Sequence, residues 1–178
     1  CLAGGGYHNR ALRSNGTVVA WGAGTNNFLP TPHFKQSLVP ATVTNAAAIS
    51  AGAYHSLALN RDGTVIAWGR FSEGQTNTPP QLRNIRAIAA GGYHSLALKS
   101  DGSVFAWGAG TNFVFPLARG QSIVPAGLSN VVAIAAGWYH SMALKADGPV
   151  VGWGDKHFGL QTDPRPADTV IADLAGAD

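Results

Sequence analysis

Cysteine is nearly missing from this sequence, which has a single one, Cys1, among 178 residues. An internal disulfide is therefore impossible, and cysteine usage gives no clue to the redox compartment. Charge is also scarce: Asp, Glu, Lys and Arg make up 12% of the residues and leave a net charge of +3. A nucleic-acid-binding surface carries clustered Lys and Arg, so we expect no nucleic-acid partner.

Long apolar runs are missing as well, because none reaches the roughly 18 residues that a membrane span needs. The sequence shows no signal peptide and no initiator methionine, so we expect it to be processed or to be a piece of a longer protein. Lipidation of Cys1 is a minor alternative, because the repeat described below starts at once, without the usual flexible tether. The low charge and the 23 glycines favour a compact all-β repeat protein.

Motifs for nucleotide binding and hydrolysis are absent too: the sequence contains no GxGxxG, Walker A, HExxH or paired-carboxylate pattern. Residues 22–24 and 108–110 read Gly-Ala-Gly, but they lack the third glycine and the following helix of a dinucleotide site. We therefore expect no cofactor and no catalytic residues.

What the sequence does contain is a repeat. One motif occurs four times without gaps, at residues 3–22, 50–69, 89–108 and 135–154, and its third copy reads AAGGYHSLALKSDGSVFAWG. Residues 94–99 have the two-residue period of a strand, and residues 104–107 are rich in β-branched and aromatic types. Asp101-Gly102 between them predicts a hairpin turn, because glycine accepts a positive φ. Residues 85–90 predict a third strand.

Small sheets repeated every forty-odd residues are typical of β-propeller blades. The motif resembles the repeat of the regulator of chromosome condensation family, and most of all its bacterial members, such as propeller-type β-lactamase inhibitor proteins. The similarity rests on AAGGYHSLAL, the Asp-Gly turn, Trp107-Gly108, and Gly74-Gln75 after Trp68-Gly69. It implies a β-propeller with blades of about forty to fifty residues. It leaves the function open, because the family includes exchange factors, inhibitors and adhesion modules.

We predict one all-β domain over residues 1–178, a β-propeller or propeller segment of four blades. The blades are expected at residues 3–49, 50–88, 89–134 and 135–174, and residues 175–178 begin a fifth repeat phase. The repeated tyrosines, Tyr7, Tyr54, Tyr93 and Tyr139, are 47, 39 and 46 residues apart, so long and short inter-blade loops alternate. An open arc of four blades would leave apolar faces at both ends, which predicts either further blades or a homo-oligomer joined through the terminal blades.

Residues that recur in every copy are expected to solve a problem that every blade has. We expect the histidine after each tyrosine to be structural, His55 and His94 to be buried and hydrogen-bonded to neighbouring backbone, and the repeated tryptophans, Trp21, Trp68, Trp107 and Trp153, to lie in the core. The residue after each histidine, Asn9 in the first copy and serine in the other three, points to the opposite face of the strand, so a His-Ser pair is not expected to be catalytic. Arg10 stands where the other copies have Leu or Met, which predicts an exposed face or a partner contact.

Unrepeated residues of the loops are the candidate binding residues, because loops on a rigid scaffold carry function. Trp138 joins them, since the other copies have Gly or Ala at its position. The full set is Phe28, His33, Phe34, Phe71, Phe113, Phe115, Arg119 and Trp138. We expect the two long loops to lie on one rim and to present their aromatic side chains together.

The favoured function is a non-enzymatic protein-binding module that recognises a partner protein through its rim loops. One alternative is a structural repeat segment of a larger secreted or surface protein. Another is a lyase or hydrolase, whose site would have to draw on loop residues that converge in one pocket: His33, Arg119, Asp155 and His157. No metal site is expected, because a zinc site needs three or four converging ligands and equivalent histidines of separate blades would converge only at the axis. An extracellular or cell-surface bacterial location is favoured over the cytoplasm.

Overall fold

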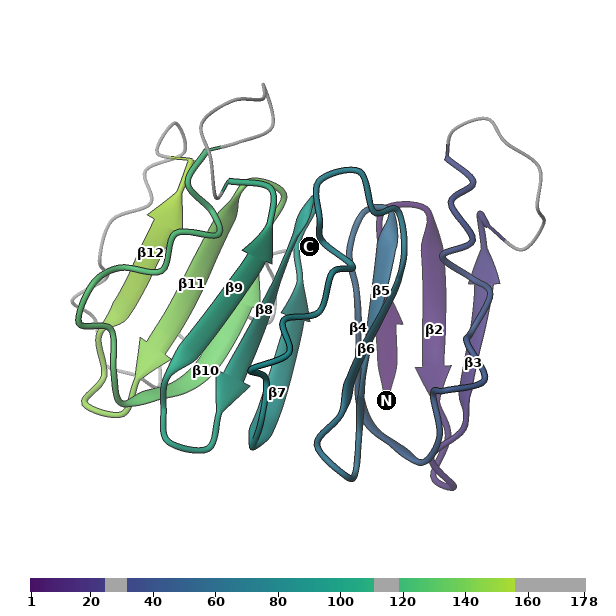
Figure 1. Cartoon of the computed structure of the whole chain (residues 1–178), viewed down its shortest axis with the longest axis horizontal. Coiled ribbons are helices and arrows are strands. Elements are labelled where there is room, and N and C mark those ends of the chain that lie inside the picture. Colours follow the sequence, from purple (N-terminus) through teal and green to yellow (C-terminus); the bar gives the residue numbers. More distant parts are fainter. Residues whose placement is uncertain (25–31, 111–118, 156–178) are drawn as a thin grey trace.

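The computed structural model describes residues 1–24, 32–110 and 119–155, and these residues form four three-stranded antiparallel sheets (Figure 1). The first sheet holds β1 (Leu2–Gly4), β2 (His8–Leu12) and β3 (Val18–Gly22), and the second holds β4 (Ala46–Ala51), β5 (His55–Asn60) and β6 (Val65–Gly69). The third holds β7 (Ile85–Ala90), β8 (His94–Lys99) and β9 (Val104–Gly108), and the fourth holds β10 (Val131–Ala136), β11 (His140–Lys145) and β12 (Val150–Gly154). The predicted all-β architecture of four blades is confirmed.

The turn between the second and third strand of each sheet follows from its Asp-Gly or Asn-Gly pair. Gly102 has a φ of 80°, which only glycine adopts without steric cost. The Asp101 carboxylate accepts a hydrogen bond from the Ser103 amide at 2.9 Å and so closes the turn from within. The hairpin predicted from the third repeat is therefore present, and it sets the register in which β8 pairs with β9.

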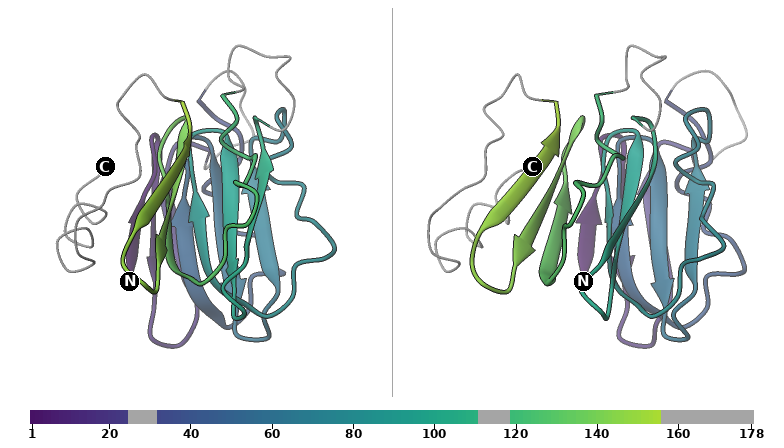
Figure 2. Two further views of the ribbon diagram at one scale, coloured as in Figure 1. Left: turned by 90° about the vertical axis from the view of Figure 1, so that its left-hand side faces the viewer. Right: turned by 60° about the vertical axis from the view of Figure 1, so that its left-hand side comes forward.

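The four sheets stand side by side in an arc, with the first strand of each on the inner side (Figure 2). β1 contacts β4, β4 contacts β7, and β7 contacts β10. Small residues permit this approach: a Cβ on Gly91 would lie 2.6 Å from the carbonyl oxygen of Gly137 in the next sheet. The Gly92 amide donates to the same oxygen at 3.1 Å, so the inner strands are joined by backbone as well as by packing.

The core consists of apolar side chains between neighbouring sheets. Leu57 packs with Ala97 and Trp107 of the third sheet, and Leu96 packs with Ala143 and Trp153 of the fourth. A third cluster joins the second sheet to the first. The second and third sheets thus bury both faces against their neighbours and the first and fourth bury one, which is how a stack of small sheets obtains a core that no single one could provide.

Trp21 departs from this pattern, and the expectation that it lies in the core was wrong. Trp68, Trp107 and Trp153 are at most 7% exposed, whereas Trp21 is 45% exposed. The buried indoles lie on the face that meets the preceding sheet. Trp21 occupies that face of the first sheet, where no described sheet covers it.

Candidate binding surface

A chain of hydrogen-bonded groups crosses the second and third interfaces between described sheets, and equivalent groups meet at the first. At the second interface His55 Nε2 lies 3.0 Å from Ser95 Oγ of the next sheet. Ser95 Oγ donates to the carbonyl oxygen of Gln75 at 2.9 Å, and the Trp107 indole donates to the same oxygen at 2.9 Å. We call this arrangement the His–Ser–carbonyl relay. The groups of the third relay are His94, Ser141, Gln121 and Trp153, and those of the first are His8, Ser56, Gln36 and Trp68.

The relay determines the protonation of the buried histidines. Ser95 uses its hydroxyl proton toward Gln75, so it accepts from His55, whose proton lies on Nε2. Burial lowers the pKa of His55 and of His94 to about 3, and both rings are therefore neutral at pH 7. The expectation that these histidines are buried was right, but their described partner is a serine of the next sheet rather than backbone.

The proximity of histidine and serine does not create a hydrolytic pair. His55, His94 and Ser95 are all 0% exposed, so no substrate can reach the hydroxyl. Each serine proton is already donated to a backbone carbonyl, which leaves the oxygen in the wrong orientation for activation by the ring. The relay is a structural joint.

Arg10 modifies the first relay, and the prediction that its face is exposed or meets a partner was wrong. The side chain is 0% exposed and lies between the first two sheets, with its guanidinium 5.0 Å from the centre of the Trp68 ring. Its nitrogens contact the carbonyl oxygen of Leu57 at 3.2 Å and His8 Nε2 at 2.8 Å. A guanidinium only donates, so His8 Nε2 accepts and its proton lies on Nδ1, the reverse of His55.

Burial of this charge has a measurable electrostatic consequence. It lowers the pKa of Arg10 to about 9. Burial, helped by the charge of Arg10, lowers the pKa of His8 to about 3. Among the described residues no carboxylate pairs with Arg10, so neutral oxygen and nitrogen acceptors and the Trp68 ring stabilise its charge.

The most prominent surface feature is a continuous cluster of aromatic rings at the end of the inner strands. We call it the aromatic surface; it consists of Tyr7, Phe34, Tyr54, Tyr93, Trp138 and Tyr139. Along the arc, Tyr7 stacks on Tyr54 with ring centres 4.9 Å apart, and Tyr54 lies 5.7 Å from Tyr93. Tyr93 stacks on Tyr139 at 5.9 Å, so the ladder runs across all four sheets.

The position of the tyrosine in the repeat explains this ladder. In each repeat the tyrosine directly precedes the histidine that opens the second strand, so it lies just beyond the end of the sheet rather than within it. Tyr7 is 45% exposed, whereas Tyr93 in the middle of the arc is 8% exposed. The hydrogen bond that the Tyr54 hydroxyl donates to the Tyr7 hydroxyl raises the pKa of Tyr7, and burial raises the pKa of Tyr93, so both phenols are neutral at pH 7.

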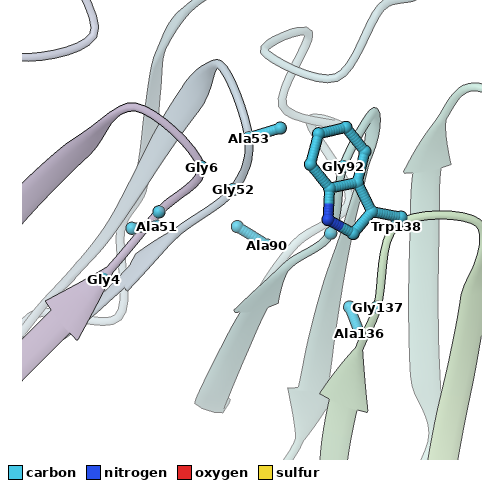
Figure 3. A pocket seen from close by; sticks show the side chains of 12 residues that line it. Gly4, Gly6, Ala51, Gly52, Ala53, Ala90, Gly92, Ala136, Gly137 and Trp138 are labelled. Carbon is cyan, nitrogen blue, oxygen red and sulfur yellow. The ribbon is translucent and has the colours of Figure 1, made fainter. Parts of the chain in front are cut away.

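Trp138 is the unrepeated member of the cluster. Its ring reaches across from the end of β10 toward Gly92 and Ala53 (Figure 3). It lies 6.5 Å from Tyr54 and 6.1 Å from Tyr93, measured between ring centres, yet remains 48% exposed. Trp138 also lines a cleft of about 300 Å³ on the concave side of the arc, whose other walls are glycine and alanine from the four inner strands.

Arg70 lies within the aromatic surface. Its guanidinium is 5.3 Å from the centre of the Phe34 ring, 5.5 Å from that of Tyr54 and 5.3 Å from that of Tyr93. Glu73 binds the same guanidinium through both carboxylate oxygens. Sequence reasoning missed the tyrosines, because repetition was interpreted as purely structural, and it also missed Arg70, which no other copy repeats. The usable signal was the place of each tyrosine directly before a buried strand position.

The other predicted site residues divide into three groups. His33, Phe34 and Phe71 line one groove of about 640 Å³, and Phe34 joins this groove to the aromatic surface through its edge-on contact with Tyr54 at 5.6 Å. Arg119 lies apart and forms an ion pair with Asp155 at 3.7 Å. Phe28, Phe113 and Phe115 lie outside the described residues.

The described residues of the alternative enzyme site do not share one groove. His33 accepts a hydrogen bond from the Gly24 amide at 2.9 Å, and the residues lining its groove do not include Arg119 or Asp155. His157 lies outside the described residues. Within residues 1–24, 32–110 and 119–155, no three His, Cys, Asp or Glu side chains gather as metal ligands would.

The repeat matches a known family. A profile described as the regulator of chromosome condensation (RCC1) repeat matches residues 46–75, 85–113 and 131–159. The chain belongs to the regulator of chromosome condensation repeat family. This confirms the similarity inferred from the AAGGYHSLAL run and the closing Trp-Gly. None of the curated protein sequences compared with this chain gives a match.

Solved propellers share the fold of this RCC1-repeat chain. Yeast RCC1 (Prp20) bound to Kap60 is 27% identical, with a TM-score of 0.64 over 85% of this chain and 41% of its own. A second structure of Prp20p from Saccharomyces cerevisiae is 24% identical, with a TM-score of 0.62 over 90% of this chain and 49% of its own. The CRINKLY WD40 ectodomain of the Arabidopsis thaliana receptor kinase ACR4 is also 24% identical, with a TM-score of 0.66 over 86% of this chain and 49% of its own.

The RCC1-repeat chain thus spans no more than about half the length of these propellers. Its four sheets correspond to a part of each ring. None of the described residues belongs to a helix that could cross a membrane.

Proposed function

We propose that this RCC1-repeat chain is a non-enzymatic binding module that recognises a segment of a partner protein on its aromatic surface. The observation that carries the proposal is the uninterrupted ring ladder together with two half-exposed rings, Tyr7 at its start, 45% exposed, and Trp138 against Tyr93 and Tyr139, 48% exposed. Tyr, Trp and Arg are the residue types that dominate binding energy at protein interfaces.

The geometry suits binding because the rings are already ordered. Tyr54 is held by Tyr7 on one side and by Tyr93 on the other, and Arg70 covers its face. Rings fixed in this way lose little conformational freedom when a partner covers them, which lowers the entropic cost of association. The phenol hydroxyls at the ring edges supply hydrogen bonds for orientation.

Arg70 supports the rings rather than acting as a free charge. Glu73 neutralises it through two contacts, so the surface has apolar faces with little net charge. We therefore expect the partner segment to be extended and rich in proline or aliphatic side chains, which pack on aromatic faces, rather than acidic.

The relatives point in the same direction. Yeast Prp20 has been crystallised with Kap60 bound, and the binding of Prp20p to Gsp1p and histones has been described. Those partners belong to Prp20. They show that a propeller with these repeats is compatible with protein recognition.

The test is to select peptides from a random display library with the purified chain and to measure their affinities by calorimetry. Trp138→Ala and Tyr7→Ala are expected to weaken binding by about tenfold or more, because each removes a half-exposed ring. Ile123→Ala is the matched control, because Ile123 is 43% exposed and lies outside the aromatic surface. Peptides that bind both ring variants as tightly as the parent would exclude the aromatic surface as the binding site.

A further inference from the structure

The three interfaces between described sheets all have the same polarity. We call the face of a sheet that presents the histidine of its second strand the leading face. The trailing face presents the serine of the same strand and the tryptophan of the third strand. At the second interface His55, on the leading face of the second sheet, contacts Ser95 on the trailing face of the third sheet, which also carries Trp107. At the other two interfaces a leading face likewise meets a trailing face.

The two outer faces of the arc are one trailing face, on the first sheet, and one leading face, on the fourth sheet. The trailing face of the first sheet presents Asn9, in the position of the serines, and Trp21, both exposed. The leading face of the fourth sheet presents His140 and Met142, both half-buried. Among the described residues, neither the Trp21 indole nor the His140 ring finds a hydrogen-bond partner. The equivalent tryptophans and histidines inside the arc take part in a relay. The exception is His8, whose Nε2 accepts from Arg10 instead.

The chemistry of the two faces is complementary. Asn9 Oδ1 is an acceptor at the position where the serine oxygen accepts from histidine, so it suits the Nε2 proton of His140. Trp21 leaves a large apolar ring in water, and covering it supplies the driving force for association. A leading face cannot pair with another leading face in this way, because neither carries the asparagine and tryptophan of a trailing face.

We propose that two copies of this chain join head to tail, with the fourth sheet of each copy covering the first sheet of the other. A front-to-back contact made twice closes a ring with two-fold symmetry. The second copy also continues the aromatic surface, since its Tyr7 becomes the next ring after Tyr139, as Tyr139 follows Tyr93 at 5.9 Å. The proposal rests on the outer faces and is independent of what the aromatic surface binds.

The test is light scattering on the purified chain across the micromolar range, with a mass of two chains expected. Trp21→Asp damages the trailing face and Met142→Asp the leading face, and each alone is expected to weaken association by about tenfold or more. A mixture of the two variants retains one intact contact between an undamaged leading face and an undamaged trailing face. An open one-to-one dimer is therefore expected from the mixture and from neither variant alone.

Several outcomes would overturn the proposal. They are a monomeric parent chain, a dimer that neither variant weakens, or folded variants that stay monomeric when mixed. Thermal melts establish that each variant is folded, and His140→Ala takes the place of Met142→Asp if the latter does not fold. Phe71→Ala is the control: Phe71 is 74% exposed in the groove beside the aromatic surface, and its loss should leave the mass unchanged.

Discussion

His94 Nε2 lies 2.8 Å from Ser141 Oγ, and this hydrogen bond crosses the interface between the third and fourth sheets. Ser141 in turn donates to the carbonyl oxygen of Gln121 at 2.8 Å, in the loop that connects the same two sheets. The relay therefore ties two sheets and their connecting loop together at one point. Its recurrence explains why histidine, serine and tryptophan keep fixed places in the repeat.

Removing one relay histidine should destabilise the fold without altering the aromatic surface. We expect His94→Ala to lower the free energy of unfolding by about 1–3 kcal/mol, because it deletes a buried donor and leaves an unfilled space. His94→Gln is the matched control, since its amide nitrogen can reach toward Ser141, and it should lose less. Urea denaturation measures both. A His94→Ala chain that unfolds like the parent would contradict the structural role.

Stability should fall as the solution becomes acidic. Burial lowers the pKa of His55 and His94 to about 3, whereas an unfolded histidine titrates near about 6.5. Between these values the unfolded chain binds protons that the native chain does not, so the free energy of unfolding decreases as pH falls from about 6.5 toward 3. Above a pH of about 6.5 the histidines are neutral in both the native and the unfolded chain, so they no longer lower the free energy of unfolding. Each histidine contributes a slope of about 1.4 kcal/mol per pH unit.

Urea unfolding at several pH values between about 7 and 4.5 measures this slope. Carboxylates also titrate near the acid end, so the informative quantity is the difference between the parent and His94→Gln. We expect the slope of the variant to be smaller by about 1.4 kcal/mol per pH unit, which corresponds to the uptake of one proton fewer on unfolding. Identical slopes would mean that His94 is protonated in the native state, contrary to its burial.

The strands and turns of the fold could be predicted from sequence because their causes are local. The alternation at residues 94–99 and the Asp101-Gly102 turn depend only on neighbouring residues. The partner of each histidine could not be predicted, because it lies in the next sheet and depends on how the sheets stack. Trp21 and Arg10 show the same limit of sequence reasoning. The repeat predicts on which face of its sheet each side chain lies, but it does not predict whether a neighbouring sheet covers that face.

The aromatic surface was predictable only in part. Trp138 and Phe34 were identified because they break the repeat, and both lie in the ring cluster. The tyrosines were passed over because they obey the repeat. A repeated residue can be structural in the middle of an arc and half-exposed at its end, as Tyr93 and Tyr7 show.

Close approach of the inner strands should make one glycine sensitive and another tolerant. A Cβ on Gly91 would lie 2.5 Å from His94 Nδ1 and 2.6 Å from the Gly137 carbonyl oxygen, so Gly91→Ala should cost about 1–3 kcal/mol. A Cβ on Gly4 would meet only Asn9 Oδ1 at 3.6 Å, so Gly4→Ala should stay within about 0.5 kcal/mol of the parent. Thermal melts of the two variants measure the difference, and equal melting temperatures would argue against the tight packing of the inner strands.

Arg10 provides a test of what a buried charge contributes here. Leucine occupies the equivalent position in the second and third repeats, as Leu57 and Leu96, and both are 0% exposed in the same kind of interface. Arg10→Leu removes a charge that no described carboxylate balances and frees His8 Nε2 to donate to Ser56, as His55 does to Ser95. We expect the variant to be as stable as the parent or more stable, by up to about 4 kcal/mol, because a packed apolar side chain replaces a poorly compensated ion.

Arg10→Ala should be less stable than Arg10→Leu, since it leaves a cavity beside Trp68. Urea denaturation ranks the three chains, and a large loss of stability in Arg10→Leu would show that the contacts of the guanidinium with His8 and the Leu57 carbonyl outweigh the cost of burying its charge.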